Sequence, residues 1–217
     1  MKLEKYIDHT YLGAADDENA VEKLCCEAKK YGFHSVCVNP SQVGTAERLL
    51  NGSKVKICSV VDFPLGQSSI HARCIEAMFA AKDGADELDI VVNQRLLNYA
   101  PEKCACDLTA VTRSARVAKS SVVLKLILEC CNLTKDEIKH GCAMAKKTGF
   151  DFVKTSTGFG KGGATVEDVK LMRKTVGKNF GVKAAGGIRT RGQALAMIEA
   201  GANRIGCSAG VAICTSK

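Results

Sequence analysis

The stretch KHGCAMAKKTGFDFVKTSTG, residues 139–158, contains one complete copy of a repeating unit. A helical segment over 139–147 is followed by Gly149, and a short apolar run over 151–155 then leads into another glycine. Glycine after a helix adopts the left-handed conformation that turns the chain out of the helix. The same order of helix, glycine, spacer, polar residue and apolar run occurs three more times. The corresponding glycine, spacer and polar residues are Gly32-Phe33-His34, Gly84-Ala85-Asp86 and Gly201-Ala202-Asn203.

The alternation of helices and apolar runs predicts a parallel sheet with helical crossovers. Helices are expected over 20–31, 70–82 and 139–147. The eight expected strands are Ile7–Thr10, Ser35–Val38, Lys56–Val61, Glu87–Val92, Val122–Leu128, Asp151–Thr155, Val182–Ala185 and Arg204–Cys207. Eight such units indicate an α/β fold, a (β/α)8 TIM barrel formed as a single domain over residues 1–217. A doubly wound open sheet is the alternative, but no GxGxxG motif follows the first strand.

The composition is typical of a soluble globular protein, with 46% hydrophobic and 25% charged residues. No apolar run approaches the roughly 20 residues that cross a bilayer, and the first residues contain no apolar signal-peptide segment. We therefore expect a cytoplasmic protein without a membrane partner. The net charge of +8 is spread along the chain. It favours anionic metabolites over nucleic acid, for which no recognised motif is present.

The chain has twelve cysteines but no CxxC spacing, so neither a zinc ribbon nor a thioredoxin-like site is predicted. We expect most of them to be reduced and to act as small core residues. Cys37 is an exception, because it lies in a strand close to the expected site. The four histidines lack metal-ligand spacing, so no metal is predicted and each is interpreted as a structural or surface residue.

Two lysines lie within apolar runs that lead into glycine-rich turns. These runs are FVKTSTG, with Lys154, and VKAAGGI, with Lys183. A lysine in a buried strand is costly unless it is paired or has a chemical task. On neighbouring strands, the two lysines are expected to lower each other's pKa, which would make an amine nucleophilic near neutral pH. The pair therefore suggests Schiff-base chemistry on a carbonyl substrate.

Further charged residues are expected to meet the two lysines inside the barrel. Asp89 and Lys125 also lie within strand-like runs, and active sites of such barrels lie at the carboxyl ends of the strands. A buried ion-pair network that only stabilises the barrel is the alternative. Near the first strand, Asp8 could support Lys183 or Lys125, and Thr10 could bind a substrate hydroxyl.

Glycine-rich turns after the last strands form a second signal. Gly158 and Gly160 follow Lys154, Gly186 and Gly187 follow the next strand, and Gly206 precedes Ser208. Successive backbone N–H groups in such turns bind phosphate groups. In (β/α)8 barrels the loops after strands seven and eight often have this function.

At these residues the chain resembles the deoxyribose-phosphate aldolases. The matching stretches are IDHT (7–10), ELDIVVN (87–93), VKTSTGF (153–159), VKAAGGIRT (182–190) and RIGCSAG (204–210). The resemblance implies a (β/α)8 class I aldolase without metal or organic cofactor. Its substrates would be 2-deoxy-D-ribose 5-phosphate, D-glyceraldehyde 3-phosphate and acetaldehyde, in deoxyribonucleotide catabolism. A homodimer is a further expectation from the resemblance.

The resemblance also implies roles for individual residues. Lys154 matches the Schiff-base lysine, while Asp89 and Lys183 match proton donors and acceptors. Lys125, Asp8, Thr10 and Cys37 would support them. The implied phosphate and substrate cradle consists of Thr157, Gly158, Gly186, Gly187, Gly206 and Ser208.

Two features depart from the family pattern. Many relatives have a C-terminal tyrosine that assists proton transfer, whereas no tyrosine follows Tyr99 here, and some have a lysine where Phe159 stands. Two other functions remain open from the residues alone. One is a different phosphate-binding barrel lyase or synthase that uses an imine, and the other is a barrel that only binds phosphorylated sugars.

Overall fold

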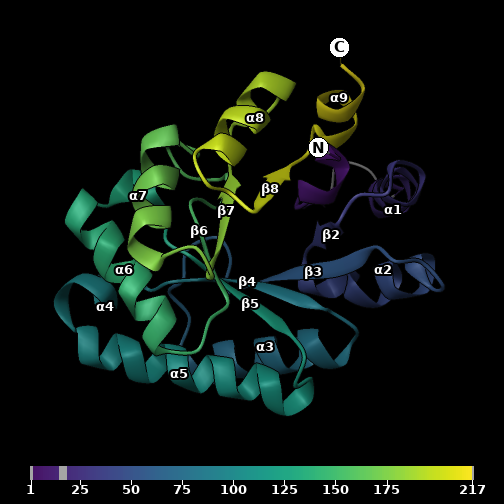
Figure 1. The fold of residues 1–217 in the computed structure, drawn as a ribbon. Coiled ribbons are helices and arrows are strands. Elements are labelled where there is room, and N and C mark those ends of the chain that lie inside the picture. Colours follow the sequence, from purple (N-terminus) through teal and green to yellow (C-terminus); the bar gives the residue numbers. More distant parts are fainter. Residues whose placement is uncertain (1, 15–18, 217) are drawn as a thin grey trace.

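A computed structural model describes residues 2–14 and 19–216 of the chain. Its eight parallel strands form a closed barrel in the order β1-β2-β3-β4-β5-β6-β7-β8, and helices surround the strands (Figure 1). The chain is therefore a single-domain (β/α)8 barrel, as predicted. The doubly wound open sheet is excluded because β1 also pairs with β8.

The strands lie close to their predicted positions. They are β1 (Ile7–Thr10), β2 (Ser35–Val38), β3 (Lys56–Val61), β4 (Glu87–Val91), β5 (Val123–Ile127), β6 (Phe152–Lys154), β7 (Gly181–Ala185) and β8 (Arg204–Cys207). The predictions for β4, β5 and β6 were too long by one residue at the carboxyl end. The apolar pattern extends beyond these strands because the next residue still donates a hydrogen bond to the neighbouring strand. Leu128, for example, donates to the carbonyl of Lys154 at 2.9 Å.

Helices follow the strands as the repeating unit requires. They are α1 (Ala20–Tyr31), α2 (Val43–Leu50), α3 (Ile70–Lys82), α4 (Gln94–Tyr99), α5 (Pro101–Ala118), α6 (Lys135–Lys147), α7 (Val166–Val176), α8 (Arg191–Glu199) and α9 (Gly210–Thr215), with short 3-10 helices η1 (Leu3–Tyr6), η2 (Pro40–Gln42) and η3 (Cys130–Asn132). The predictions for α1 and α3 are confirmed. Helix α6 begins at Lys135, four residues earlier than predicted, because Thr134 and Glu137 form a capping box there.

The glycines after the helices have the predicted conformation. Gly32 follows α1 with φ of 68°, and its N–H donates to the carbonyl of Ala28. Gly149 has φ of 85° in the unit quoted at the outset. Both φ values lie in the region that side chains disfavour, so glycine is the residue that lets the chain turn from helix into strand.

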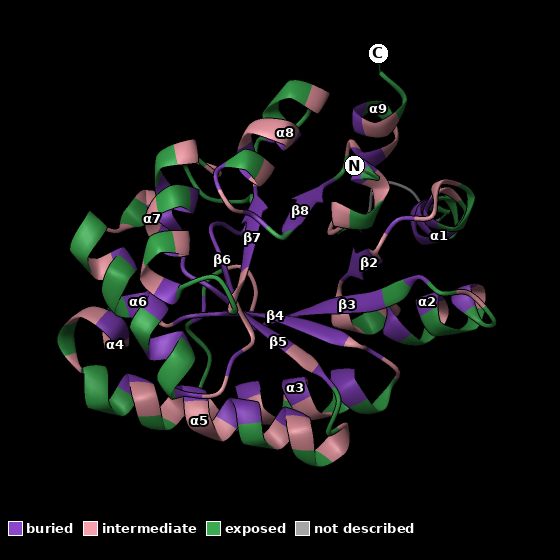
Figure 2. Ribbon diagram, in the orientation of Figure 1, coloured by how far each residue is buried: buried purple, intermediate pink, exposed green. Residues whose placement is uncertain are grey.

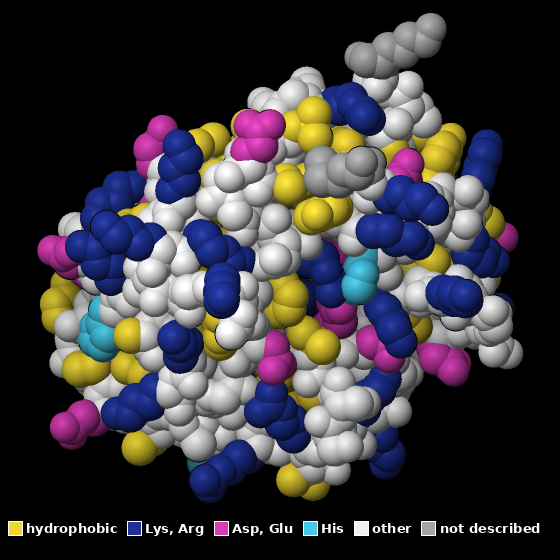
Figure 3. Space-filling view, viewed as in Figure 1, with side chains coloured by type: hydrophobic (Ala, Val, Ile, Leu, Met, Phe, Trp, Pro, Cys, Tyr) yellow, Lys and Arg dark blue, Asp and Glu magenta, His cyan; other side chains and the backbone are white. Residues whose placement is uncertain are grey.

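Burial follows the barrel architecture. The strands are almost entirely buried, whereas the surrounding helices alternate between buried and exposed positions (Figure 2). Lysine and arginine side chains are distributed among acidic ones on the visible face (Figure 3). Within residues 2–14 and 19–216, every helix is too short or too polar to span a membrane.

The strand register brings the charged residues together. Asp89 on β4 pairs with Lys125 on β5, and Lys154 on β6 pairs with Lys183 on β7. All four residues are buried. The barrel thus contains ionised groups where a small protein usually has only apolar ones.

Candidate active site

Asp89 is the centre of the buried charges. Its Oδ2 atom lies 2.9 Å from Lys154 Nζ and 2.8 Å from Lys183 Nζ. Its Oδ1 atom accepts a hydrogen bond from Lys125 Nζ at 2.7 Å and one from Cys58 Sγ at 3.2 Å. One carboxylate therefore joins three ammonium groups and a thiol from four different strands.

Asp8 on β1 is a second acidic centre of this network. Its Oδ2 atom lies 2.6 Å from Lys183 Nζ, and its Oδ1 atom accepts from Arg204 Nη1 at 2.9 Å. Of the two partners expected for Asp8, the structure selects Lys183. Lys183 is therefore held between two carboxylates, those of Asp8 and Asp89.

Two residues of this network were missed from the sequence. Glu87 lies 2.7 Å from Lys125 Nζ, and Arg204 donates to Glu87 at 2.9 Å. Glu87 is two residues before Asp89 on the same strand, so strand periodicity could have placed both on one face. His34, interpreted from the sequence as a structural or surface residue, joins this network because its Nε2 lies 3.0 Å from the Glu87 carboxylate.

The electrostatic environment corrects one expectation. Burial opposes the charge of Lys183, but the carboxylates of Asp8 and Asp89 outweigh burial and raise the pKa of Lys183. The expectation that each lysine lowers the pKa of its neighbour is thus wrong for Lys183. Burial also opposes the charge of Asp89, yet Lys125, Lys154 and Lys183 hold its pKa well below its usual range. Lys183 and Asp89 are therefore an ion pair at neutral pH.

A cavity of about 240 Å³ opens at the carboxyl ends of β1, β6, β7 and β8. Lys154 is its only lysine among the described residues. Eight predicted site residues line it: Thr10, Lys154, Thr157, Gly158, Gly186, Gly187, Gly206 and Ser208. The other predicted residues, Asp8, Cys37, Asp89, Lys125 and Lys183, are buried outside this lining. Arg189 also lines the cavity and was not selected from the sequence, although it directly follows the VKAAGGI run.

The glycine turns of the cavity fit closely together. A Cβ atom on Gly163 would lie 2.2 Å from the carbonyl oxygen of Gly186, and the N–H of Ala164 donates to that oxygen at 3.0 Å. Gly186 itself has φ of 88°. Gly206 also has a packing function that was not expected, because a Cβ there would lie 3.0 Å from Lys183 Cε. Glycine at 206 therefore leaves space for the Lys183 side chain as well as lining the cavity.

Glu129 supports the loop after β6 and was also missed. Thr157 donates hydrogen bonds to the Glu129 carboxylate through both its hydroxyl and its N–H. Glu129 lies beyond β5, which ends at Ile127, and its backbone is left-handed with φ of 56°. The left-handed backbone directs this carboxylate to the loop that carries Thr157.

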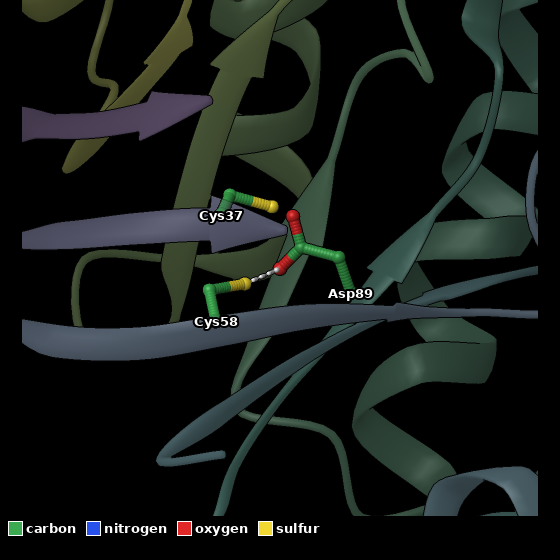
Figure 4. Close-up of side chains that lie close together, drawn as sticks. All are labelled: Cys37, Cys58 and Asp89. Atoms are coloured by element: carbon green, nitrogen blue, oxygen red, sulfur yellow. Dashed lines mark hydrogen bonds between the residues drawn. The ribbon is translucent and has the colours of Figure 1, made fainter. Parts of the chain in front are cut away.

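Two clusters offer donor atoms of the kinds that metals bind. Cys37, Cys58 and Asp89 form one, and Asp8, His34 and Glu87 form the other, each with donor atoms within 4.8 Å of one another. Figure 4 shows the first cluster, in which both thiol side chains point toward the Asp89 carboxylate. The carboxylates of both clusters already bind lysine or arginine. Neighbouring cations disfavour a further cation, so the prediction of no metal is retained.

Fold and site together define a class of protein. A closed (β/α)8 barrel with a cavity at the carboxyl ends of its strands and a lysine in that cavity is typical of an enzyme acting on a small molecule. Residues 2–216 match the DeoC/LacD family aldolase profile, and the chain belongs to this family.

Relatives support this membership over nearly the whole chain. The deoxyribose-phosphate aldolase of Thermoanaerobacter sp. strain X514 is 51% identical over 214 residues, covering 98% of this chain and 96% of the relative. That of Thermococcus gammatolerans is 52% identical over 216 residues, covering 98% and 95%. The tetrameric deoxyribose-phosphate aldolase structure from Aeropyrum pernix superposes with a TM-score of 0.91 at 32% identity, covering 98% of this chain and 89% of that one.

Proposed function

We propose that this protein is a class I aldolase that reversibly cleaves 2-deoxy-D-ribose 5-phosphate to D-glyceraldehyde 3-phosphate and acetaldehyde. The observation that carries the proposal is Lys154 in the cavity, bound to the carboxylate that also holds Lys183. Two relatives at about 50% identity are named deoxyribose-phosphate aldolase, and each is matched over nearly its full length. In a cell this reaction would belong to deoxyribonucleotide catabolism.

Lys154 is the proposed nucleophile. After losing one proton, its amine attacks the aldehyde carbon of the open-chain sugar, and loss of water leaves a protonated imine. When the hydroxyl on C3 loses its proton, the C2–C3 bond breaks and the protonated imine at C1 accepts its electron pair. Cleavage then releases glyceraldehyde 3-phosphate and leaves an enamine on Lys154. Protonation of the enamine carbon and hydrolysis release acetaldehyde.

Asp89 and Lys183 are the proposed proton carriers for these steps. Asp89 Oδ2 lies 2.9 Å from Lys154 Nζ, so it is within reach of the proton that the nucleophile must lose. Lys183 contacts the same oxygen at 2.8 Å and can replace a proton transferred from Asp89. Asp8 and Lys125 support the two residues as ion-pair partners.

The phosphate end of the substrate is assigned to the glycine turns of the cavity. Gly186, Gly187 and Ser208 offer backbone N–H groups, and Arg189 adds a positive charge to the lining. Thr10 also lines the cavity, so it stays a candidate for binding a sugar hydroxyl. Cys37 lies next to Asp89 instead of in the cavity, and we assign it no contact with substrate.

The experiment that tests the proposal combines trapping with turnover. Acetaldehyde followed by borohydride should add an ethyl group to Lys154, located by peptide mapping, and the untreated protein should cleave deoxyribose 5-phosphate. An adduct without cleavage would favour a different imine-forming lyase or synthase. Phosphate binding without an adduct would favour a barrel that only binds sugar phosphates.

The oligomeric state and the cellular location are two further predictions. The homodimer expected from the resemblance is to be measured by light scattering, because the Aeropyrum pernix relative is described as a tetramer. The cytoplasmic location is to be measured by fractionating cells of the source organism.

A further inference from the structure

Two cysteines face each other inside the barrel. Cys37 on β2 pairs in register with Cys58 on β3, and both residues are fully buried. Neighbouring strands lie about 4.8 Å apart, and disulfides span Cα atoms separated by about 4.4–6.8 Å. The two Sγ atoms and a carboxylate oxygen of Asp89 lie within 4.8 Å of one another (Figure 4). The backbone separation therefore already suits a disulfide.

This pair differs from the other cysteines in its position and contacts. In the registers of the eight described strands, Cys37 and Cys58 are the one pair of cysteines directly opposite each other. Cys58 donates to Asp89 Oδ1 at 3.2 Å and accepts from Lys125 Nζ at 3.3 Å. The other oxygen of Asp89 binds Lys154 and Lys183. The thiol pair is therefore separated from the candidate nucleophile by one carboxylate group.

We propose that Cys37 and Cys58 are a redox modification site, in which hydrogen peroxide forms a reversible disulfide that suppresses imine formation at Lys154. The disulfide itself follows from the arrangement of the two thiols. Its effect on Lys154 rests on the function proposed above.

The two sulfurs are suited to different steps of the oxidation. The adjacent Cys58 thiol lowers the pKa of Cys37 most, burial opposes this, and the Lys183 and Lys154 ammonium groups lower it further. Burial raises the pKa of Cys58 well above its usual range. Because a thiolate is the reactive form, Cys37 is the sulfur that attacks the oxidant and Cys58 is the one that resolves the product.

The reaction balances with one molecule of peroxide. The Cys37 thiolate attacks one oxygen, the O–O bond breaks, and a sulfenic acid and hydroxide are formed. Cys58 sulfur then attacks Cys37 sulfur and the S–O bond breaks. The Cys58 proton leaves with the departing hydroxide as water. The hydroxide of the first step takes up the proton that Cys37 lost on ionising. Both sulfurs are thus oxidised by one electron each, and peroxide is reduced to two molecules of water.

The disulfide would change the contacts of Asp89. A disulfide sulfur has no proton, so the hydrogen bond from Cys58 to Asp89 Oδ1 is lost, and Lys125 loses a polarisable acceptor. Asp89 Oδ1 then accepts one hydrogen bond fewer, so the carboxylate keeps more of its negative charge for its remaining partners. It binds the ammonium groups at Oδ2 more strongly, which keeps Lys154 protonated and unreactive.

Access limits which oxidants can react. Leu12 packs against the cluster of Cys37, Cys58 and Val60, and it also lines the cavity. Leu12 therefore contacts both the cavity and the two thiols, and we propose that hydrogen peroxide enters past this side chain. We therefore expect peroxide to react and a bulky aromatic disulfide reagent to modify the exposed Cys106 while sparing Cys37. Leu12→Ala should accelerate the reaction with peroxide.

The test treats the reduced native protein with hydrogen peroxide, blocks remaining thiols in denaturant and maps peptides without reduction. The expected result is a Cys37–Cys58 cross-link with the loss of two hydrogens. Borohydride-trapped acetaldehyde on Lys154 should fall about tenfold and should return after reduction with dithiothreitol. Cys58→Ala cannot form the cross-link, whereas Cys106→Ser, on the surface of α5, should behave like the unaltered protein.

Three results would count against the inference. Absence of the cross-link at a peroxide dose that oxidises Cys106 would overturn it. A cross-link that leaves imine trapping unchanged would overturn the link to Lys154. If the reduced protein traps no acetaldehyde at all, the proposed aldolase function is refuted, and so is the proposed effect of the disulfide on Lys154. The Cys37–Cys58 cross-link itself is tested separately, by peptide mass.

Discussion

Lys154 and Lys183 are bound to the same oxygen atom. Their Nζ atoms lie 2.9 Å and 2.8 Å from Asp89 Oδ2. Lys183 is also held by Asp8, which makes it the more strongly fixed cation of the two. Among the described residues, Lys154 forms an ion pair with Asp89 alone, and its side chain lines the cavity. This asymmetry separates a lysine suited to attack from one suited to hold charge.

Replacement of the cavity lysine tests its role as nucleophile. Lys154→Ala should reduce cleavage of deoxyribose 5-phosphate by at least about 10³-fold, because the covalent step is lost. Intact mass after acetaldehyde and borohydride should show no ethyl adduct. Lys170→Ala, an exposed lysine on α7, should retain both activities. Full turnover in Lys154→Ala would refute the imine mechanism.

Replacement of the second lysine tests the coupling between the two. In Lys183→Met, Asp89 loses one of its cations and binds the ammonium form of Lys154 more strongly. The pH at which half of the protein is trapped by acetaldehyde and borohydride should therefore move upward. Lys183→Arg retains the charge and should stay closer to the original profile. Identical pH profiles for the methionine variant and the unaltered protein would show that the two lysines are independent.

The buried acids predict how stability depends on pH. Burial opposes the charge of Glu87, but Lys125, His34 and Arg204 lower its pKa, and the pKa values of Asp8 and Asp89 are also lowered. A carboxyl group with a lowered folded-state pKa contributes stability above its unfolded pKa of about 4 and loses it as the pH falls further. The free energy of unfolding should therefore decrease on acidification below about pH 4.

Glu87→Gln tests this dependence by urea unfolding at a series of pH values. At pH 7 the variant should be less stable by about 3–5 kcal/mol, since Lys125 and Arg204 lose a buried partner. Its stability should also change less steeply below about pH 4, because one titrating group is absent. Asp136→Asn removes an exposed partner of Lys139 and should have little effect on either quantity. Equal acid sensitivity in Glu87→Gln and the unaltered protein would contradict the assignment.

The contact between glycine turns predicts a specific effect on substrate binding. Gly163→Ala places a Cβ against the Gly186 carbonyl, so the turn must shift. We expect KM for deoxyribose 5-phosphate to increase about tenfold with a smaller change in kcat, and stability to fall by about 1–3 kcal/mol. Gly192→Ala has no atom within 4 Å of the new Cβ and lies in helix α8, so it should be neutral or stabilise by up to about 1 kcal/mol. An unchanged KM in Gly163→Ala would argue against a phosphate site at Gly186.

The barrel was predictable because its signals are local. Each glycine after a helix and each apolar run depends on residues close in sequence, and the ends of α1 and α3 were predicted correctly for this reason. The start of α6 was missed because its first turn is polar and is specified by the Thr134–Glu137 capping box. The predicted strands were one residue too long where the residue after the strand still hydrogen-bonds to the neighbouring strand.

The sequence predicted which lysines and which aspartate form the buried cluster, but it did not predict the pKa values of these groups. Charged residues within apolar runs are expensive, so Lys154, Lys183 and Asp89 stood out in the sequence. The pKa of Lys183 depends instead on how near Asp8 and Asp89 lie, across strands β1 and β4. Glu87 and Arg204 were missed because each lies at the start of its strand, where a charge is ordinary on the surface.

The sequence by itself therefore determined the repeating unit, the eight strands and the identity of the charged residues within them, because these follow from periodicity and the cost of burying charge. Only the tertiary structure decided which carboxylate holds which ammonium group and which residues line the cavity. It also placed Cys37 opposite Cys58 beside Asp89. The physical reason is that Coulomb interactions and hydrogen bonds depend on distances of a few ångströms between strands far apart in the chain, which barrel closure and strand register fix.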